Sequence, residues 1–289
     1  NQMPDLCEGS DQAGKIRPDL AKRWGLSESV VFAGGAGDNA AGAVGIGAVG
    51  EERTFVSMGT SGVYFVASDG YHACPQKTVH SFCHALPNKW HQMGVILSAA
   101  SCIKTASQWF GEKSEVDFIQ LLSKDSYDVD LCTVFLPYLS GERTPHNNPQ
   151  ASGVFFGLTH STNKASFIQS VLEGVAFAFA DCQSALYDAG VNPKEITLIG
   201  GGSRSKLWGE ILATVLNKPI VYVEDGDQGP AFGGAKLAAL CYHPERATEI
   251  LAPQKSVDRI EPNQAWREGL SKRLSLYRSL YQQVKPLFK

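Results

Sequence analysis

Apolar residues in this chain fall into short runs that alternate with longer stretches of helical spacing. Runs rich in Val, Ile, Phe and Tyr are typical of strands. They lie at residues 30–33, 53–59, 62–68, 91–97, 132–139, 196–199 and 219–223. The second and third runs meet at Gly59, Thr60, Ser61 and Gly62, which predicts a hairpin with a glycine-bounded turn.

Helical spacing is clearest between residues 164 and 189. Apolar side chains there recur every three or four positions along one face: Phe167, Val171, Val175, Phe179, Cys182 and Leu186. Gly190 follows, and glycine commonly ends a helix. Further helices are predicted at residues 39–49, 99–110, 205–217, 231–241 and 266–284.

Strands and helices alternate from residue 196 onward, and this order is typical of an α/β fold with parallel strand pairs. The last predicted helix has apolar residues near heptad spacing. We interpret it as a helix that packs on the fold, with a partner surface as the alternative. The sequence leaves a homodimer open.

Composition narrows the class of protein. The chain has 289 residues, 43% of them hydrophobic and 19% charged, with a formal net charge of −3 and no basic stripe, which argues against a nucleic-acid binder. No apolar run reaches membrane-spanning length, and no signal-peptide pattern opens the chain. The seven cysteines form no CxxC pair, so we expect reduced thiols in a soluble, cytoplasmic protein.

The sequence SMGTSG, residues 57–62, is a candidate anion site. Its turn offers backbone N–H groups and the hydroxyls of Thr60 and Ser61, and concave arrays of such donors bind phosphate. An ordinary hairpin turn is the alternative interpretation of these residues alone.

A second glycine turn lies in IGGGSRSKLW, residues 199–208. We expect Ser203 to cap the following helix, whose N-terminus attracts negative charge. Gly201 and Gly202 would let a nucleotide lie against the backbone. The spacing differs from GxGxxG, and the acidic ribose partner of a dinucleotide site is missing at the expected place, which disfavours an oxidoreductase. A plain strand-to-helix turn is the alternative.

Asp38 stands in AGGAGDNAAGAVGIG, residues 33–47, as the one acidic residue among small and apolar neighbours. Helix capping would explain it. Yet the flanking glycines leave its carboxylate accessible, with the Asn39 amide beside it, and an accessible carboxylate can act as a general base in phosphoryl transfer.

Two other polar groups have structural interpretations. His80, Cys83, His84 and His91 lie close together, but alternate side chains of an extended segment face opposite ways, so we expect a packing role rather than a zinc site. Glu142 and Arg143 are expected to pair with each other in a loop.

In combination and in this order, these motifs resemble the FGGY family of carbohydrate kinases. The matching stretches are the acid at a glycine turn, MGTSG, the block from Gly153 to Gly174, GGGSRSKLW and GPAFGGAKLA. The resemblance covers the chain from about Leu6 to about Leu240. It implies an α/β, ribonuclease H-like (actin-like ATPase) fold, with a mixed sheet flanked by helices.

The resemblance also implies a role for each matched residue. Asp38 would be the base that takes a proton from the sugar, with Asn39 beside it. Gly59, Thr60 and Ser61 would hold the γ-phosphate of ATP. Gly201 and Gly202 would approach the α-phosphate and ribose, with Ser203 and Lys206 near the adenine. Mg²⁺ would arrive with ATP, held mostly by phosphates, water and carboxylates, and no residue is singled out as a metal ligand.

The implied reaction is ATP-dependent phosphorylation of a pentulose, with D-xylulose favoured. Ribulose, gluconate or glycerol are alternative substrates, and a non-catalytic nucleotide-binding module is a different class of function. The DxGT hairpin of the family is missing upstream of Asp38. We therefore expect residues 1–50 to be the remnant of a first, sugar-binding domain and residues 51–289 to be the second, nucleotide-binding domain. A chain without most of the first domain should have little kinase activity on its own.

Overall fold

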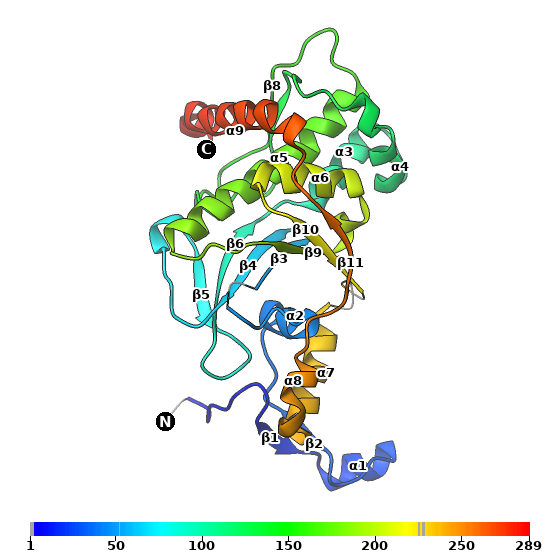
Figure 1. The fold of residues 1–289 in the computed structure, drawn as a ribbon, viewed down its shortest axis with the longest axis vertical. Coiled ribbons are helices and arrows are strands. Elements are labelled where there is room, and N and C mark those ends of the chain that lie inside the picture. Colours follow the sequence, from blue (N-terminus) through cyan, green and yellow to red (C-terminus); the bar gives the residue numbers. More distant parts are fainter. Residues whose placement is uncertain (1–2, 52, 225, 227–228) are drawn as a thin grey trace.

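A seven-stranded mixed sheet forms the centre of the computed structural model, which describes residues 3–51, 53–224, 226 and 229–289 (Figure 1). Across the sheet the strands are β11 (Ser256–Ile260), β10 (Ile220–Val223), β9 (Ile196–Ile199), β3 (Thr54–Met58), β4 (Gly62–Ser68), β6 (Trp90–Ile96) and β5 (His80–Cys83). Strands β3, β9 and β10 are parallel, and the other neighbours are antiparallel. The predicted parallel pairing is confirmed.

The central hairpin is apolar on both sides, as expected for strands covered on both faces. Phe55 pairs with Phe65 across β3 and β4, and their rings stack at 4.7 Å on one face of the sheet. Val56 pairs with Tyr64 and packs in the larger core on the other face. The period-two alternation of the strands thus supplies two cores from one hairpin.

Helices α3 (Ala100–Trp109), α5 (Lys164–Asp188) and α6 (Lys206–Leu216) cover one face of the sheet. The long α5 begins at its N-cap Asn163, whose side chain accepts a hydrogen bond from the amide of Ser166. Among the described residues, it is the helix long and apolar enough to cross a membrane, but 83% of that apolar window is buried within the protein. It is the central helix of the larger core.

Helix α2 (Asp38–Ile46) covers the other face, and α7 (Gly229–Tyr242) packs on α2, with α8 (Ala247–Ile250) after it, both leading away from the sheet (Figure 1). The two longer helices cross at glycines. A Cβ atom on Gly45 would lie 3.2 Å from the amide nitrogen of Gly233, and one on Gly233 would lie 1.7 Å from the carbonyl oxygen of Ala41. The small residues after Asp38 therefore serve close helix packing.

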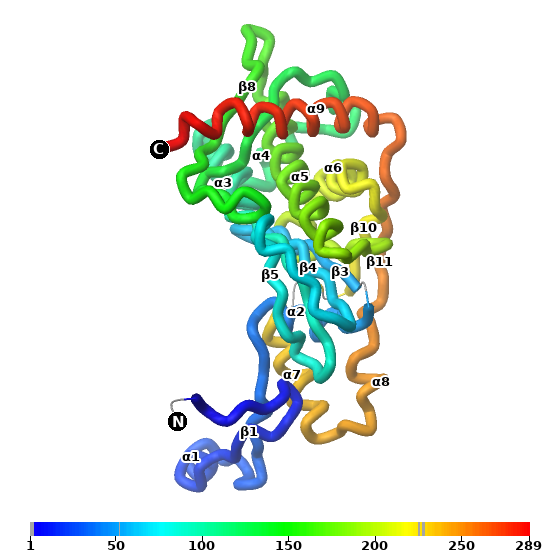
Figure 2. Tube along the Cα trace, turned by 90° about the vertical axis from the view of Figure 1, so that its left-hand side faces the viewer, coloured from blue at the N-terminus to red at the C-terminus, as the bar shows by residue number. Residues whose placement is uncertain are grey.

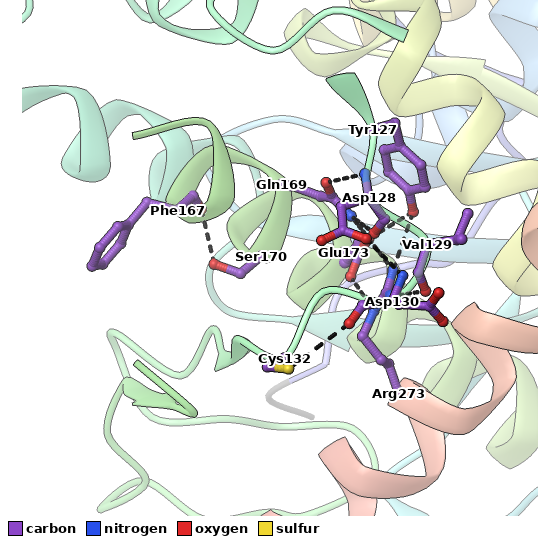
Figure 3. A network of polar contacts seen from close by, with 10 residues as sticks. All are labelled: Tyr127, Asp128, Val129, Asp130, Cys132, Phe167, Gln169, Ser170, Glu173 and Arg273. Carbon is purple, nitrogen blue, oxygen red and sulfur yellow. Dashed lines mark hydrogen bonds and ion pairs between the residues drawn. The ribbon is translucent and has the colours of Figure 1, made fainter. Parts of the chain in front are cut away.

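The last helix, α9 (Gln264–Val284), is attached through a buried ion pair (Figure 3). Arg273 donates from Nε to Glu173 Oε2 of α5 at 2.8 Å and also contacts the carbonyl of Val129. Tyr127 donates to the same carboxylate at 2.6 Å, and its ring stacks on Trp266. The predicted packing role of this helix is confirmed.

The N-terminal residues lie at the far end of the molecule from α9 (Figure 2). They form β1 (Gln12–Lys15), α1 (Pro18–Trp24) and β2 (Val31–Ala33), with β1 and β2 antiparallel. A third sheet pairs β7 (Val134–Leu136) with β8 (Val154–Phe156). The remaining elements are α4 (Glu115–Gln120) and the 3₁₀ turns η1 (Pro75–Lys77), η2 (Lys124–Ser126), η3 (Gly201–Arg204), η4 (Pro244–Arg246) and η5 (Lys285–Leu287).

Candidate functional site

A cavity of about 570 Å³ opens between the β3–β4 turn, α3, α4 and the η3–α6 segment. Five residues predicted from the two glycine motifs line it: Gly59, Thr60, Gly201, Gly202 and Lys206. The parallel pairing of β3 with β9 explains this, because the carboxyl ends of both strands lead into these turns at the same edge of the sheet. Two motifs about 140 residues apart in sequence therefore meet at one cavity.

The β3–β4 turn is held through its carbonyl groups. The amides of Ala99 and Ala100 donate to the carbonyls of Thr60 and Gly59, both at 2.9 Å, and the Ser101 hydroxyl also donates to Thr60 at 2.7 Å. Thr60 and Ser61 are exposed. The carbonyls of the turn are thus occupied by the start of α3, and its two hydroxyl residues are exposed, as a site for an anion requires.

Each of the three glycines in the second turn occupies its position for a different physical reason. Gly200 has a φ of +86° and lies against the backbone of Met58, so its conformation requires glycine. A Cβ on Gly202 would lie 2.8 Å from the Met58 side chain. Gly201 has open space within 4 Å of that position and is exposed. Gly201 is therefore the glycine that a ligand can approach, whereas Gly202 is fixed by packing.

Ser203 does not cap α6, so that prediction is wrong. Its hydroxyl donates to the carbonyl of Gly200 at 2.7 Å within the 3₁₀ turn. Ser205 is the N-cap and accepts from the amide of Trp208 at 3.2 Å. The turn Gly201–Arg204 places the N-cap two residues later than the predicted Ser203, and α6 begins at Lys206, next to the predicted start at residue 205. Ser203 instead lines a neighbouring cavity of about 430 Å³, which shares Gly201 and Arg204 with the larger one.

Positive charge exceeds negative charge around the larger cavity. Its lining contains Lys104, Arg204 and Lys206 and a single acid, Glu115. Lys206 pairs with Asp258 at 2.6 Å and lies over the Tyr222 ring at 3.4 Å. Lys104 and Arg204 form no ion pair within the described part of the chain. This balance favours an anionic ligand.

Sequence reasoning missed one wall of this cavity. It is built from α3, α4 and Leu122 just after α4, and is mainly apolar: Ile103, Val116, Ile119 and Leu122, with Gln120 among them. A flat apolar ring would fit such a wall. Short apolar helices carry no motif in the sequence, so only the placement of these residues beside the glycine turns identifies them.

Asp38 is the first residue of α2 and is exposed. The N-cap is Gly37, so the capping interpretation of Asp38 is wrong. Its Oδ1 accepts from the amide of Asn39 at 2.8 Å and from the Asn39 side chain at 3.1 Å. Neither of these two residues, nor Ser61, lines the cavities described above.

Glu142 and Arg143 do not form the predicted ion pair among the described contacts. The side chain of Glu142 is 2% exposed, and its Oε1 accepts from the amides of Leu97 at 3.0 Å and Arg143 at 2.7 Å. Burial raises the pKa of this carboxyl to about 8. Glu142 is thus a core residue, whereas Arg143 is exposed.

The histidines pack against aromatic rings. His91 stacks on Phe65 at 4.7 Å, and His84 meets the same ring edge-on. Burial lowers the pKa of each to about 4, so both are neutral near pH 7. Among the residues that the structure describes, no group of three or more His, Cys, Asp or Glu is arranged for a metal ion.

Comparison with known proteins adds family relationships. Residues 54–242 match the FGGY family of carbohydrate kinases, C-terminal domain, and residues 1–45 match the N-terminal domain of that family. The chain is 46% identical to a xylulose kinase of Escherichia coli (strain K12) and 43% identical to one of Klebsiella pneumoniae. Each alignment covers 99% of this chain and 59% of the relative.

A solved structure described as a xyloylose kinase from Brucella ovis is similar at a TM-score of 0.94 and 45% identity. That match covers 99% of this chain and 59% of the other. Together with the mixed sheet flanked by helices, it confirms the predicted ribonuclease H-like, actin-like ATPase fold. This chain spans about three-fifths of the length of these relatives.

Proposed function

The chain belongs to the FGGY family of carbohydrate kinases, and we propose that it supplies the nucleotide-binding part and the catalytic base of a pentulose kinase. The favoured reaction converts D-xylulose and ATP to D-xylulose 5-phosphate and ADP, because relatives at 46% and 43% identity are xylulose kinases. In this proposal residues 1–50 belong to the sugar-binding domain and residues 51–289 to the nucleotide-binding domain.

The observation that carries the proposal is the cavity of about 570 Å³ at which the two glycine turns meet. Gly59, Thr60 and Ser61 take the terminal phosphate through amides and hydroxyls. Gly201 lets the backbone approach the α-phosphate and ribose, while Gly202 keeps the turn in place. The apolar wall of α3 and α4 accommodates the adenine, a refinement of the predicted contacts from Ser203 and Lys206.

Asp38 is the proposed general base, with Asn39 orienting its carboxylate. It takes the proton from the terminal hydroxyl of the sugar as that oxygen attacks the γ-phosphorus. The bond between the γ-phosphorus and its bridging oxygen breaks, and ADP leaves with the bonding electrons. General-base catalysis of this kind contributes about 10²–10⁴-fold to a rate.

Mg²⁺ is the metal proposed to accompany ATP, where it neutralises charge on the phosphates. The described residues contain no acidic cluster for a resident metal. Phosphate oxygens and water would therefore supply most of its ligands, as this ion prefers.

The proposal includes a role in xylose metabolism in the cytoplasm. All seven cysteines are free in the structure, which suits a reducing compartment. A small-molecule sugar and ATP are the proposed substrates.

Steady-state kinetics of this chain joined to the first domain found in its relatives would test the proposal. Asp38→Asn should reduce D-xylulose-dependent ADP formation by at least about 100-fold while nucleotide affinity is unchanged. Thr60→Val should lower kcat more than it weakens ATP binding, because charge develops on the transferred phosphoryl group. Equal loss of turnover and binding in the Asp38 variant would instead indicate a folding role.

Substrate class is tested in the same assay. Ribulose, gluconate and glycerol are offered beside D-xylulose, and a higher kcat/KM for one of them would replace the proposed sugar. Nucleotide binding without turnover on any sugar would favour a non-catalytic module.

A further inference from the structure

One buried acid outside the cavity is connected to it through the backbone. Glu142 has 2% of its surface exposed, and its Oε2 has no hydrogen-bond partner among the described residues. Its Oε1 accepts two backbone hydrogen bonds. Burying a carboxyl group costs free energy unless its oxygens are hydrogen-bonded, so the position of this one calls for a structural or functional explanation.

The reason lies at the edge of the sheet. Strand β5 pairs with β6 only as far as Met93, which leaves the edge of β6 from Gly94 onward without a strand neighbour. The loop at 142–144 takes the place of that neighbour. Thr144 and Val95 exchange two hydrogen bonds at 3.0 Å, and the next outward amide, that of Leu97, donates to Glu142.

Leu97 is two residues from the start of the segment that holds the phosphate turn. Ala99 and Ala100 donate their amides to the carbonyls of Thr60 and Gly59. Ser98, between them and Leu97, is 1% exposed, so this short connection is packed in the core. A displacement of Leu97 would therefore move the turn as well, because few rotatable backbone bonds lie between the two.

We propose that Glu142 is a positioning residue: by holding Leu97 it fixes the start of α3, and with it the Thr60 turn that takes the terminal phosphate. The inference rests on the proposed function of that turn. Glu142 is not among the residues that line the cavity, so in this proposal it acts through the backbone that it holds.

The chemistry of the group supports a role as a neutral acceptor. Burial raises the pKa of Glu142, so near neutral pH it is largely protonated, with one oxygen free to accept from two amides. Glutamine has the same shape and the same acceptor oxygen, and it carries no charge. Alanine removes the acceptor and leaves the amide of Leu97 buried without a partner.

Binding of two nucleotides that differ in the terminal phosphates tests the proposal. The chain is titrated by calorimetry with AMP and with the Mg²⁺ complex of a non-hydrolysable ATP analogue. Glu142→Ala should weaken binding of the triphosphate by about tenfold, the cost of one lost buried hydrogen bond, and change AMP binding by less than about twofold. Glu142→Gln should restore triphosphate binding to within about twofold of the original chain.

A second buried acid serves as the matched control. Glu173 is 1% exposed and its carboxylate bonds to Arg273 and Tyr127 rather than to the segment before α3. Glu173→Gln should affect both nucleotides by the same factor, whatever it does to the melting temperature. Circular dichroism of every variant checks that it is folded.

The outcomes separate this inference from the proposed function. Failure of the original chain to bind either nucleotide would overturn the proposed function and this inference with it. Nucleotide binding by the original chain with an equal loss of AMP and triphosphate affinity in Glu142→Ala would overturn the inference alone. Unchanged triphosphate binding in Glu142→Ala, or no rescue by glutamine, would also overturn it.

Discussion

The close crossing of α2 and α7 predicts how much a methyl group at their contact would destabilise the protein. A methyl group added at Gly233 would lie 1.7 Å from the carbonyl oxygen of Ala41, whereas ordinary contacts begin at 3.4 Å. The two helices would have to separate by the difference, about 1.7 Å. The obstructing atom belongs to the backbone, so no side-chain rotation relieves the clash.

Overpacking in a core typically costs about 1–3 kcal/mol, and we expect Gly233→Ala to lie at the upper end, near 3 kcal/mol. Gly234 is the matched control, because a Cβ there meets no atom within 4 Å on the same helix. Gly234→Ala should raise the free energy of unfolding by about 0.5–1 kcal/mol through helix propensity alone. The two variants should therefore differ by roughly 3–4 kcal/mol.

Urea unfolding monitored by far-ultraviolet circular dichroism measures both values, with the slope m compared to confirm that the same transition is observed. Equal stabilities for the two variants would refute the account of the crossing. A more stable Gly233→Ala would do so more strongly, since it would mean that the helices do not approach as described.

Three further predictions concern buried charge. The pKa of Glu142 is raised from its usual value to about 8 by burial, opposed in part by Arg143 and reinforced by Asp181. Its contribution to stability is therefore complete below about pH 4.5 and is lost as pH rises through 8. In urea unfolding, the stability of the original chain relative to Glu142→Gln should fall by on the order of 5 kcal/mol over that range. The pKa of His91 is lowered to about 4 by burial, with His84 and His80 adding to the effect. Its own contribution to stability should therefore fall by on the order of 3 kcal/mol as pH drops from 6.5 toward 4, measured as the difference between the original chain and His91→Phe in a pH series of melting curves. Arg273→Met should cost about 3–5 kcal/mol in urea unfolding because it leaves the Glu173 carboxylate buried without its partner, and a loss below 1 kcal/mol would contradict that.

The central elements of the fold were predictable because their patterns are local. The hairpin of β3 and β4 and the helix α5 are specified by apolar spacing and by the glycines or asparagine at their ends. Strands β1, β5, β8 and β11 were missed. In β11, four of five residues are exposed, and it becomes a strand through antiparallel pairing with β10, which is a tertiary interaction.

The candidate site was predictable only where a motif has backbone consequences. Gly59 and Gly201 were identified because glycine turns are distinctive, and the parallel pairing of their strands brings them to one cavity. The cap of α6 was assigned to Ser203 instead of Ser205 because a 3₁₀ turn lies between the glycines and the helix. Glu142 was wrongly predicted to pair with Arg143, because adjacency in sequence cannot show that its side chain turns inward to the amide of Leu97.

A crystal structure of the chain with the Mg²⁺ complex of a non-hydrolysable ATP analogue would test the central claim most directly. The account predicts the terminal phosphate within hydrogen-bonding distance of the Thr60 turn, the ribose and α-phosphate beside Gly201, and the base against the α3–α4 wall. Nucleotide bound elsewhere, or a cavity without nucleotide at a saturating concentration, would contradict it.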